Sequence, residues 1–154
     1  MKESSHNFPD CFYRVTVKAA CVRSGKLLLV RESEKHSGQK WELPGGGLDF
    51  GEDISVALSR EIKEETGLKV TKISQAPIYT WTAKSENKRG LDWFYSCVLV
   101  HRVEFEDLDI TPSDECEAVE FFDSQQLSSL RLSGQLTPLK ERFNPVDFED
   151  LFWT

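Results

Sequence analysis

The alternation of apolar and polar residues predicts several β-strands. Residues 13–32 contain two apolar, β-type runs separated by Ser24 and Gly25, a pair typical of a hairpin turn. Residues 41–43 form a short extended piece that ends at Pro44. Further strands are expected at about 69–83, 92–103 and 119–122. The lysine-rich residues 83–90 are expected to form a solvated hairpin loop.

The same pattern predicts one longer helix. Asp53, or the residue just before it, can cap a helix that runs to about Thr66, and Gly67 stands where a C-cap glycine belongs. The glycines at 45–47 are expected to form a loop whose backbone can approach another group closely, since they have no Cβ. Short helices are expected at 124–130 and 137–143. Strands with interspersed helices indicate an α/β or α+β fold with a mixed sheet.

Length and composition indicate one ordinary globular domain over residues 1–154. The chain is 39% hydrophobic and 29% charged, which argues against a disordered protein. Its longest apolar runs are too short to span a bilayer, and residues 1–10 lack the apolar segment of a secretory signal, so a cytoplasmic protein with no membrane partner is expected. The cysteines lack C-x-x-C pairs and are expected to be reduced and mostly buried.

The net charge of -7 bears on the choice of partner. Duplex nucleic-acid binding draws its affinity from a basic face, so a duplex partner is not expected. An acidic protein that handles a phosphorylated substrate needs local cations, and divalent metal ions are one source of them.

Glu61, Glu64 and Glu65 form an unusual acidic cluster on the expected helix. At about 100° per residue they fall on the same side as the apolar residues, whereas serines and basic residues fill the opposite arc. A solvated acidic face is the ordinary explanation of such a cluster, but these positions argue against it. Buried carboxylates need partners, so either their pKa values rise or a cation binds. Hard oxygen donors of this kind suit Mg²⁺, or Mn²⁺ in its place.

The segment from Gly46 to Leu68 resembles the signature of Nudix hydrolases. The signature is G-x5-E-x7-R-E-U-x-E-E-x-G-U, where U is aliphatic, and the chain matches it at Gly46, Glu52, Arg60, Glu61, Ile62, Glu64, Glu65, Gly67 and Leu68. The preceding WELPGG and the later FFD-x-x-x-L are also similar to family members. The resemblance implies a mixed sheet between helices, a loop-helix-loop at the signature, and hydrolysis of a nucleoside diphosphate linked to a group X.

The resemblance also implies roles for individual residues. Glu61, Glu64 and Glu65 would hold the metal, together with the main-chain carbonyl of Gly45, and Glu64 or Glu61 would act as general base. The resemblance further pairs Glu52 with Arg60 as the internal ion pair that supports the loop, expected away from the carboxylate face. An additional acid from a later loop completes the site in some members; among Asp114, Glu115 and Glu117, Glu115 aligns best, with a merely solvated acid as the alternative.

Substrate contacts are less defined by the sequence. Arg31, at a strand end, is either a phosphate ligand of the kind the family uses or an exposed arginine without a ligand. Trp41 either stacks on a base or packs beside a buried strand, and the same two options hold for the aromatic residues Tyr79, Trp81, Trp93 and Phe94. His36 and His101 are interpreted as incidental.

Two other functions stay open at this point. A non-catalytic Nudix module that binds a nucleotide or a protein is disfavoured because every acid of the signature is present. An RNA 5'-end pyrophosphohydrolase would need a basic surface, for which only Lys84, Lys88 and Arg89 offer a local patch. The identity of X and the oligomeric state, including a homodimer, are left undecided by the sequence.

Overall fold

The computed structural model describes residues 11–33, 39–86 and 93–149. Its strands are β1 (Cys11–Ala20), β2 (Val22–Arg23), β3 (Lys26–Arg31), β4 (Trp41–Glu42), β5 (Gly45–Gly47), β6 (Val70–Ile73), β7 (Tyr79–Glu86), β8 (Trp93–Phe105) and β9 (Ala118–Phe122). Its helices are α2 (Ile54–Thr66), α3 (Ser124–Ser129) and α4 (Leu139–Arg142), with short 3-10 turns at Gly134–Leu136 and Pro145–Phe148.

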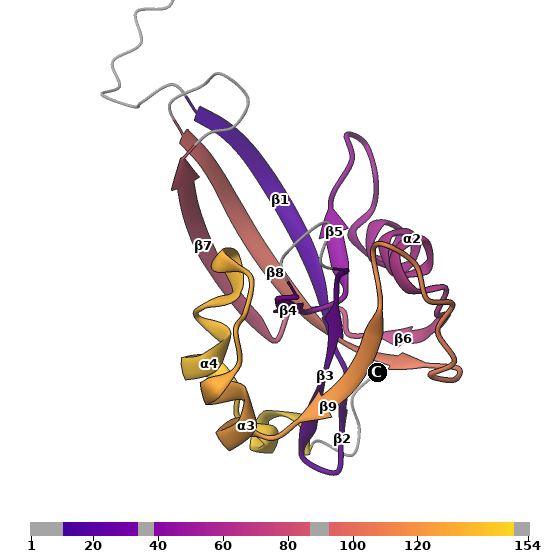
Figure 1. Cartoon of the computed structure of the whole chain (residues 1–154). Helices are drawn as coiled ribbons and strands as arrows, with labels where there is room; N and C mark the ends of the chain where they lie inside the picture. The colour runs from indigo at the N-terminus through magenta and orange to yellow at the C-terminus, as the bar shows by residue number, and fades with distance from the viewer. Residues whose placement is uncertain (1–10, 34–38, 87–92, 150–154) are drawn as a thin grey trace, which may run out of the picture.

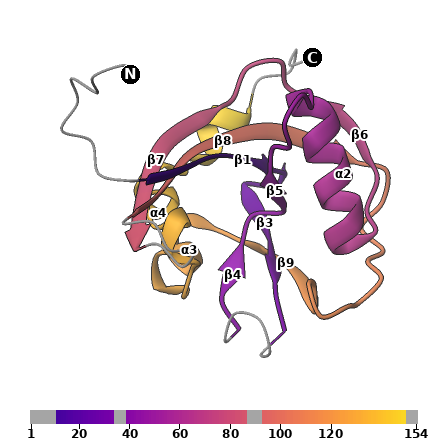
Figure 2. The same cartoon turned by 90° about the horizontal axis from the view of Figure 1, so that it is seen from above.

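The described strands form a mixed sheet with a second, smaller sheet against it. In the first sheet the order is β5-β1-β8-β6, with β7 also paired to β8, and β1 runs parallel to β8 whereas the other pairs are antiparallel. In the second sheet, β3 pairs with β2, β4 and β9. Helix α2 covers one side and α3 and α4 lie on the other, so the strands lie between helices as expected (Figures 1 and 2).

The core has two halves that meet at β3. Leu27 and Leu29 face the half beneath α3 and α4, whereas Leu28 and Val30 face the half beneath α2, and all four are fully buried. A strand buried on both faces has a continuous apolar run instead of an alternating one, which explains the run at 27–30. Helix α2 adds Ile62 to the second half.

The predicted hairpin is confirmed. Ser24 and Gly25 both have positive φ, 52° and 74°, and connect β2 to β3 as a two-residue turn. The expected strand at 69–83 is divided into β6 and β7, because Pro77 lies between them and cannot donate a main-chain hydrogen bond. Strand β7 continues to Glu86, so the first part of the expected loop at 83–90 is strand, and the rest lies outside the described residues.

The glycine run departs from the predicted loop. Residues Gly45–Gly47 form β5, which pairs with β1 through Val17 opposite Gly46 and Lys18 opposite Gly45. The close approach itself is confirmed, because a Cβ on Gly46 would lie 2.5 Å from the carboxylate of Glu61. At Gly46 a side chain would displace the carboxylate of Glu61, whereas Gly45 is required by the main chain itself, since a Cβ there would collide with the carbonyl oxygen of Val17.

Candidate metal and phosphate site

Helix α2 positions the three glutamates, and both of its predicted ends are confirmed. The carboxylate of Asp53 accepts from the N–H of Ile54 at 3.0 Å, and Gly67 ends the helix with φ of 77°. Leu58 and Ile62 are fully buried, which fixes the rotation of the helix against the sheet. The acidic residues therefore lie in a defined arc beside β5.

The glutamates differ in burial more than the helical pattern predicted. The side chain of Glu61 is 24% exposed, whereas that of Glu64 is 59% exposed. The expectation that all three point toward the protein is therefore wrong for Glu64, which lies at the edge of the arc and is more than half exposed. Glu65 is the most enclosed, and burial raises its pKa to about 8.

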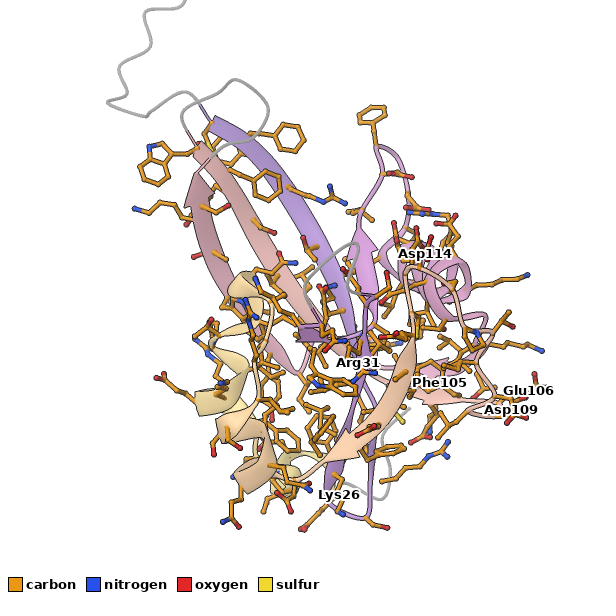
Figure 3. The ribbon with its side chains drawn as sticks, in the orientation of Figure 1. Lys26, Arg31, Phe105, Glu106, Asp109 and Asp114 are labelled. Carbon is orange, nitrogen blue, oxygen red and sulfur yellow. The ribbon has the colours of Figure 1, made fainter. Side chains whose placement is uncertain are left out.

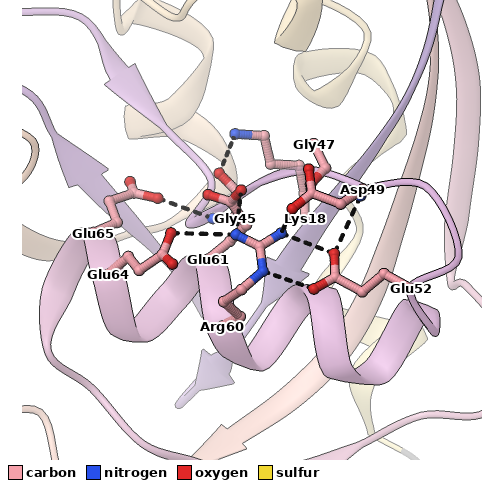
Figure 4. A network of polar contacts seen from close by, with 9 residues as sticks. All are labelled: Lys18, Gly45, Gly47, Asp49, Glu52, Arg60, Glu61, Glu64 and Glu65. Atoms are coloured by element: carbon pink, nitrogen blue, oxygen red, sulfur yellow. Dashed lines mark hydrogen bonds and ion pairs between the residues drawn. The ribbon is translucent and has the colours of Figure 1, made fainter.

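Arg60 connects the helix to the loop that precedes it (Figure 4). Its guanidinium donates to both carboxylate oxygens of Glu52, at 2.7 and 2.8 Å, and a third nitrogen donates to Glu61 at 3.0 Å and Glu64 at 3.2 Å. This ion pair lowers the pKa of Glu52 to about 2 and raises that of Arg60. The pairing of Arg60 with Glu52 agrees with the expectation. Arg60 was also expected to lie away from the carboxylate face, and this is wrong, because its long side chain reaches Glu61 and Glu64.

Lys18 supplies a second cation to the site, and sequence analysis missed it. Its side chain is 3% exposed and its ammonium group donates to Glu42 at 2.5 Å and to the carbonyl of Gly45 at 3.0 Å. The N–H of Gly45 donates in turn to Glu65 at 3.2 Å. Lys18 lowers the pKa of Glu65, against the larger upward effect of burial and the upward effects of Glu42 and Glu32. A lysine inside the apolar run of β1 was the available sequence signal.

A cavity of about 820 Å³ opens beside this cluster. Its acidic end is lined by Glu32, Glu42 and Glu65, with Lys18 among them, and β5 forms one wall. Its other end is lined by Arg14, Lys84 and Phe94. Of the residues predicted for the site, Gly45, Gly46 and Glu65 line this cavity, whereas Glu52 lines a neighbouring cavity of about 690 Å³.

Arg31 and Trp41 lie side by side, outside the wall of this cavity. They pair across β3 and β4, and the guanidinium carbon of Arg31 lies 5.3 Å from the centre of the indole ring of Trp41. Arg31 is labelled in Figure 3, on strand β3 beside β9. Arg31 also forms an ion pair with Glu117 at 3.3 Å. Trp41 is only 9% exposed and packs edge-on against Phe122, with 4.8 Å between the ring centres. This supports the packing alternative for Trp41.

The other aromatic candidates are dispersed. Trp81 is 7% exposed and donates to the carbonyl of Gln135, Tyr79 donates to Asp147, and Phe94 lines the cavity. Lys84 lies over the ring of Trp93 at 5.0 Å. His101 is buried and hydrogen-bonded to Ser74, and His36 lies outside the described residues.

Glu115 lies in the exposed segment before β9. Its N–H donates to the hydroxyl of Ser113, and no ion pair of its carboxylate is found within the described ranges. The next residue, Cys116, is fully buried, and its thiol pKa rises to about 11 through burial and the nearby charge of Glu65. The segment therefore passes close to the acidic end of the cavity, while the side chain of Glu115 is exposed.

The residues present fit a hard divalent cation in their chemistry. Carboxylate oxygens of Glu61 and Glu64 converge on one nitrogen of Arg60, and Glu65 and Lys18 meet on the two sides of Gly45. The acidic oxygens thus already face cationic groups of the protein. Over the ranges that the structure describes, no three His, Cys, Asp or Glu side chains are gathered into a ready-made metal site. Binding an ion here therefore needs Glu61 and Glu64 to turn from Arg60 toward Glu65.

Comparisons with known proteins agree with this geometry. A sequence model of the NUDIX domain matches residues 12–144. An ADP-ribose pyrophosphatase of Methanocaldococcus jannaschii is 28% identical over 116 residues, which are 75% of this chain and 65% of that protein. An RNA pyrophosphohydrolase of Novosphingobium aromaticivorans is 39% identical over 57 residues, 36% of this chain and 35% of that protein.

The fold also matches solved structures. A MutT protein from Methanosarcina mazei Go1 superposes with a TM-score of 0.68 at 23% sequence identity, covering 90% of this chain and 95% of that one. The chain spans 26% to 65% of the length of the first curated relatives that it matches. No helix among the described residues is long and apolar enough to cross a bilayer. The family match over residues 12–144, on a fold that places the signature helix beside β5, shows that the chain belongs to the Nudix family.

Proposed function

We propose that this protein catalyses the metal-dependent hydrolysis of the diphosphate linkage in a nucleoside diphosphate joined to a group X. The observation that carries the proposal is the meeting of Glu65 with Gly45 at the acidic end of an 820 Å³ cavity. Cavities of this size are typical for ligands as large as a nucleotide. Acidic groups at one end suit a cation, and the glycine wall lets a phosphate approach the main chain.

The metal, Mg²⁺ or Mn²⁺, would be held by Glu61, Glu64, Glu65 and the carbonyl of Gly45. When bound, it would neutralise charge on the phosphate oxygens and acidify an attacking water. The chain's own contribution begins with Arg60, which is anchored by Glu52 and pairs with the carboxylates of Glu61 and Glu64, so these two would turn from Arg60 to hold the metal. Glu64 is the more exposed of those two, so it is accessible to accept a proton from water; Glu61 is the alternative base.

Lys18 and Glu65 prepare the acidic end of the cavity for a metal ion and a phosphate. Lys18 keeps the carbonyl of Gly45 turned toward the cavity and balances the charge of Glu42. Glu65 is enclosed, so it favours a cation strongly once its proton has left. Glu115 would be an accessory ligand of the metal only if its carboxylate, which is exposed in this structure, turned toward the cavity.

Hydrolysis of RNA 5' ends is the second candidate function. It is supported by the name of the Novosphingobium relative and by Arg14 and Lys84 at the far end of the cavity. The net charge of -7 argues against a broad nucleic-acid surface, so a small nucleotide is favoured.

A substrate panel tests the proposal. Nucleoside triphosphates, nucleotide sugars, ADP-ribose and dinucleotides are incubated with and without Mg²⁺, and phosphate release is coupled through pyrophosphatase or phosphatase. A 5'-triphosphate RNA is analysed by electrophoresis in parallel. We expect turnover that requires metal and is lost in Glu64→Gln. Absence of turnover on every compound, or full turnover in excess chelator, would overturn the proposal.

A further inference from the structure

One face of β1 carries polar residues where a strand at the centre of a sheet is ordinarily apolar. Alternate residues of a strand point to the same side, and on this side β1 presents Arg14, Thr16 and Lys18. All three line the cavity. The hydroxyls of Thr16 and Ser96 are hydrogen-bonded at 2.8 Å between them, so the floor between the two cations is polar as well. The opposite face of β1 is apolar and packs toward α2.

Arg14 differs from the other arginines near the site because its charge is not balanced. Arg60 pairs with Glu52 and Arg31 pairs with Glu117, but Arg14 forms no hydrogen bond or ion pair with any residue in the described ranges. Its side chain is half-buried against the wall of the cavity. A partly buried guanidinium without a carboxylate is costly, and an anion bound in the cavity would offset that cost.

Gly47 leaves space for the guanidinium group of Arg14. A Cβ on Gly47 would collide with the guanidinium group of Arg14, so the absence of a side chain makes the room that Arg14 occupies. Gly47 is two residues along β5 from Gly45, a distance of roughly 7 Å in a strand. A phosphate chain that begins at Gly45 is thus within reach of Arg14. Lys84, exposed at the same end of the cavity, adds a second positive charge.

We propose that Arg14, seated over Gly47, binds an anionic group X, so that the preferred substrates are nucleoside diphosphates whose X is itself a phosphate, as in a nucleoside triphosphate. This inference rests on the proposed hydrolase function of the same cavity. Arginine presents a planar fork of donors that matches a phosphate group, and X is the part of the substrate that this fork contacts. A neutral X, such as the sugar of a nucleotide sugar, leaves the guanidinium without a partner.

The test compares two substrates in matched variants. Values of kcat/KM are measured for ATP and for ADP-glucose in the wild type, Arg14→Gln and Arg14→Lys. We expect Arg14→Gln to lower kcat/KM for ATP by about tenfold to a hundredfold, the range for losing a hydrogen bond to a charged group. ADP-glucose should change by less than about threefold, and Arg14→Lys should fall between the wild type and Arg14→Gln because it keeps the charge and loses the fork.

Controls separate this inference from the proposed function. Arg23→Gln removes an arginine of β2 that pairs with Glu104 of β8 and does not line the cavity, so kcat/KM for both substrates should stay unchanged. Calorimetry with inorganic tripolyphosphate and pyrophosphate, at fixed Mg²⁺, measures binding without turnover; we expect Arg14→Gln to weaken tripolyphosphate alone. Equal losses for both substrates, or none, would overturn the inference. If no compound is hydrolysed but tripolyphosphate binding still depends on Arg14, the proposed function fails and the anion site stands. If the wild type and Arg14→Gln bind tripolyphosphate equally, the anion site is overturned.

Discussion

The ammonium group of Lys18 donates to the carbonyl oxygen of Gly45 at 3.0 Å, from a side chain that is almost fully buried. The same group pairs with Glu42, whose side chain is 13% exposed. This lysine therefore brings a fixed positive charge to the main-chain oxygen beside Glu65. It links β1, β4 and β5 at the acidic end of the cavity.

Lys18→Met should destabilise the protein strongly. The methionine fills the space but leaves the carboxylate of Glu42 nearly buried without its cation, and removing one partner of such a pair costs about 3 kcal/mol or more. Chemical unfolding monitored by tryptophan fluorescence measures the loss. In the double variant Lys18→Met, Glu42→Gln, part of the stability should return, since the unpaired charge is gone. A single variant as stable as the wild type would contradict the role given to the pair.

The pairing of Glu52 with Arg60 should make stability depend on pH in the acid range. The pKa of Glu52 falls from its ordinary 4.5 to about 2 in the folded protein. A lowered carboxylate pKa contributes stability that is present above about pH 4.5 and is lost as the pH falls toward 2. The free energy of unfolding of the wild type should therefore approach that of Glu52→Gln on acidification. Urea unfolding at several pH values checks this, and a constant difference between the two proteins would contradict it.

Metal binding should stabilise the fold. The carboxylates of α2 come together only in the native state, so Mg²⁺ or Mn²⁺ binds the folded chain and raises its melting temperature by mass action. At a free metal concentration about 100 times the Kd, the gain is about 2.7 kcal/mol. Thermal unfolding with metal and with chelator measures the shift. Glu115→Gln should retain it, and Glu65→Gln should lose most of it; an unchanged melting temperature at saturating metal would count against the site.

Glu64→Gln should abolish most turnover while the fold stays intact. The side chain is 59% exposed and Arg60 keeps its other partners, so the substitution disturbs little of the packing. Losing a general base or a charged ligand lowers kcat by at least about a hundredfold, with a smaller change in KM. Steady-state kinetics on a substrate from the panel measures both constants.

Glu115→Gln provides the comparison for that experiment. Because the carboxylate of Glu115 is exposed and has no hydrogen-bond or ion-pair partner among the described residues, its loss should change kcat only slightly. A loss as large as that of Glu64→Gln would instead make Glu115 part of the site. Near wild-type kcat for Glu64→Gln would place the catalytic centre elsewhere.

The sequence by itself determined the local features of this protein. The turn at Ser24 and Gly25, the cap at Asp53 and the end of α2 at Gly67 follow from main-chain preferences of single residues, which do not depend on distant parts of the chain. The signature from Gly46 to Leu68 identified the family for the same reason: its spacing is contained within one segment.

Only the tertiary structure decided which residues share the cavity. Lys18 meets Gly45 because β1 pairs with β5 across 27 positions of sequence, and Arg14 stands over Gly47 through the same pairing. The exposure of Glu64 and the burial of Trp41 depend likewise on what other elements cover. Helical periodicity gives the direction of a side chain relative to its own helix, whereas its burial, its charge partners and its access to a ligand depend on segments that are distant in sequence and that the fold brings together.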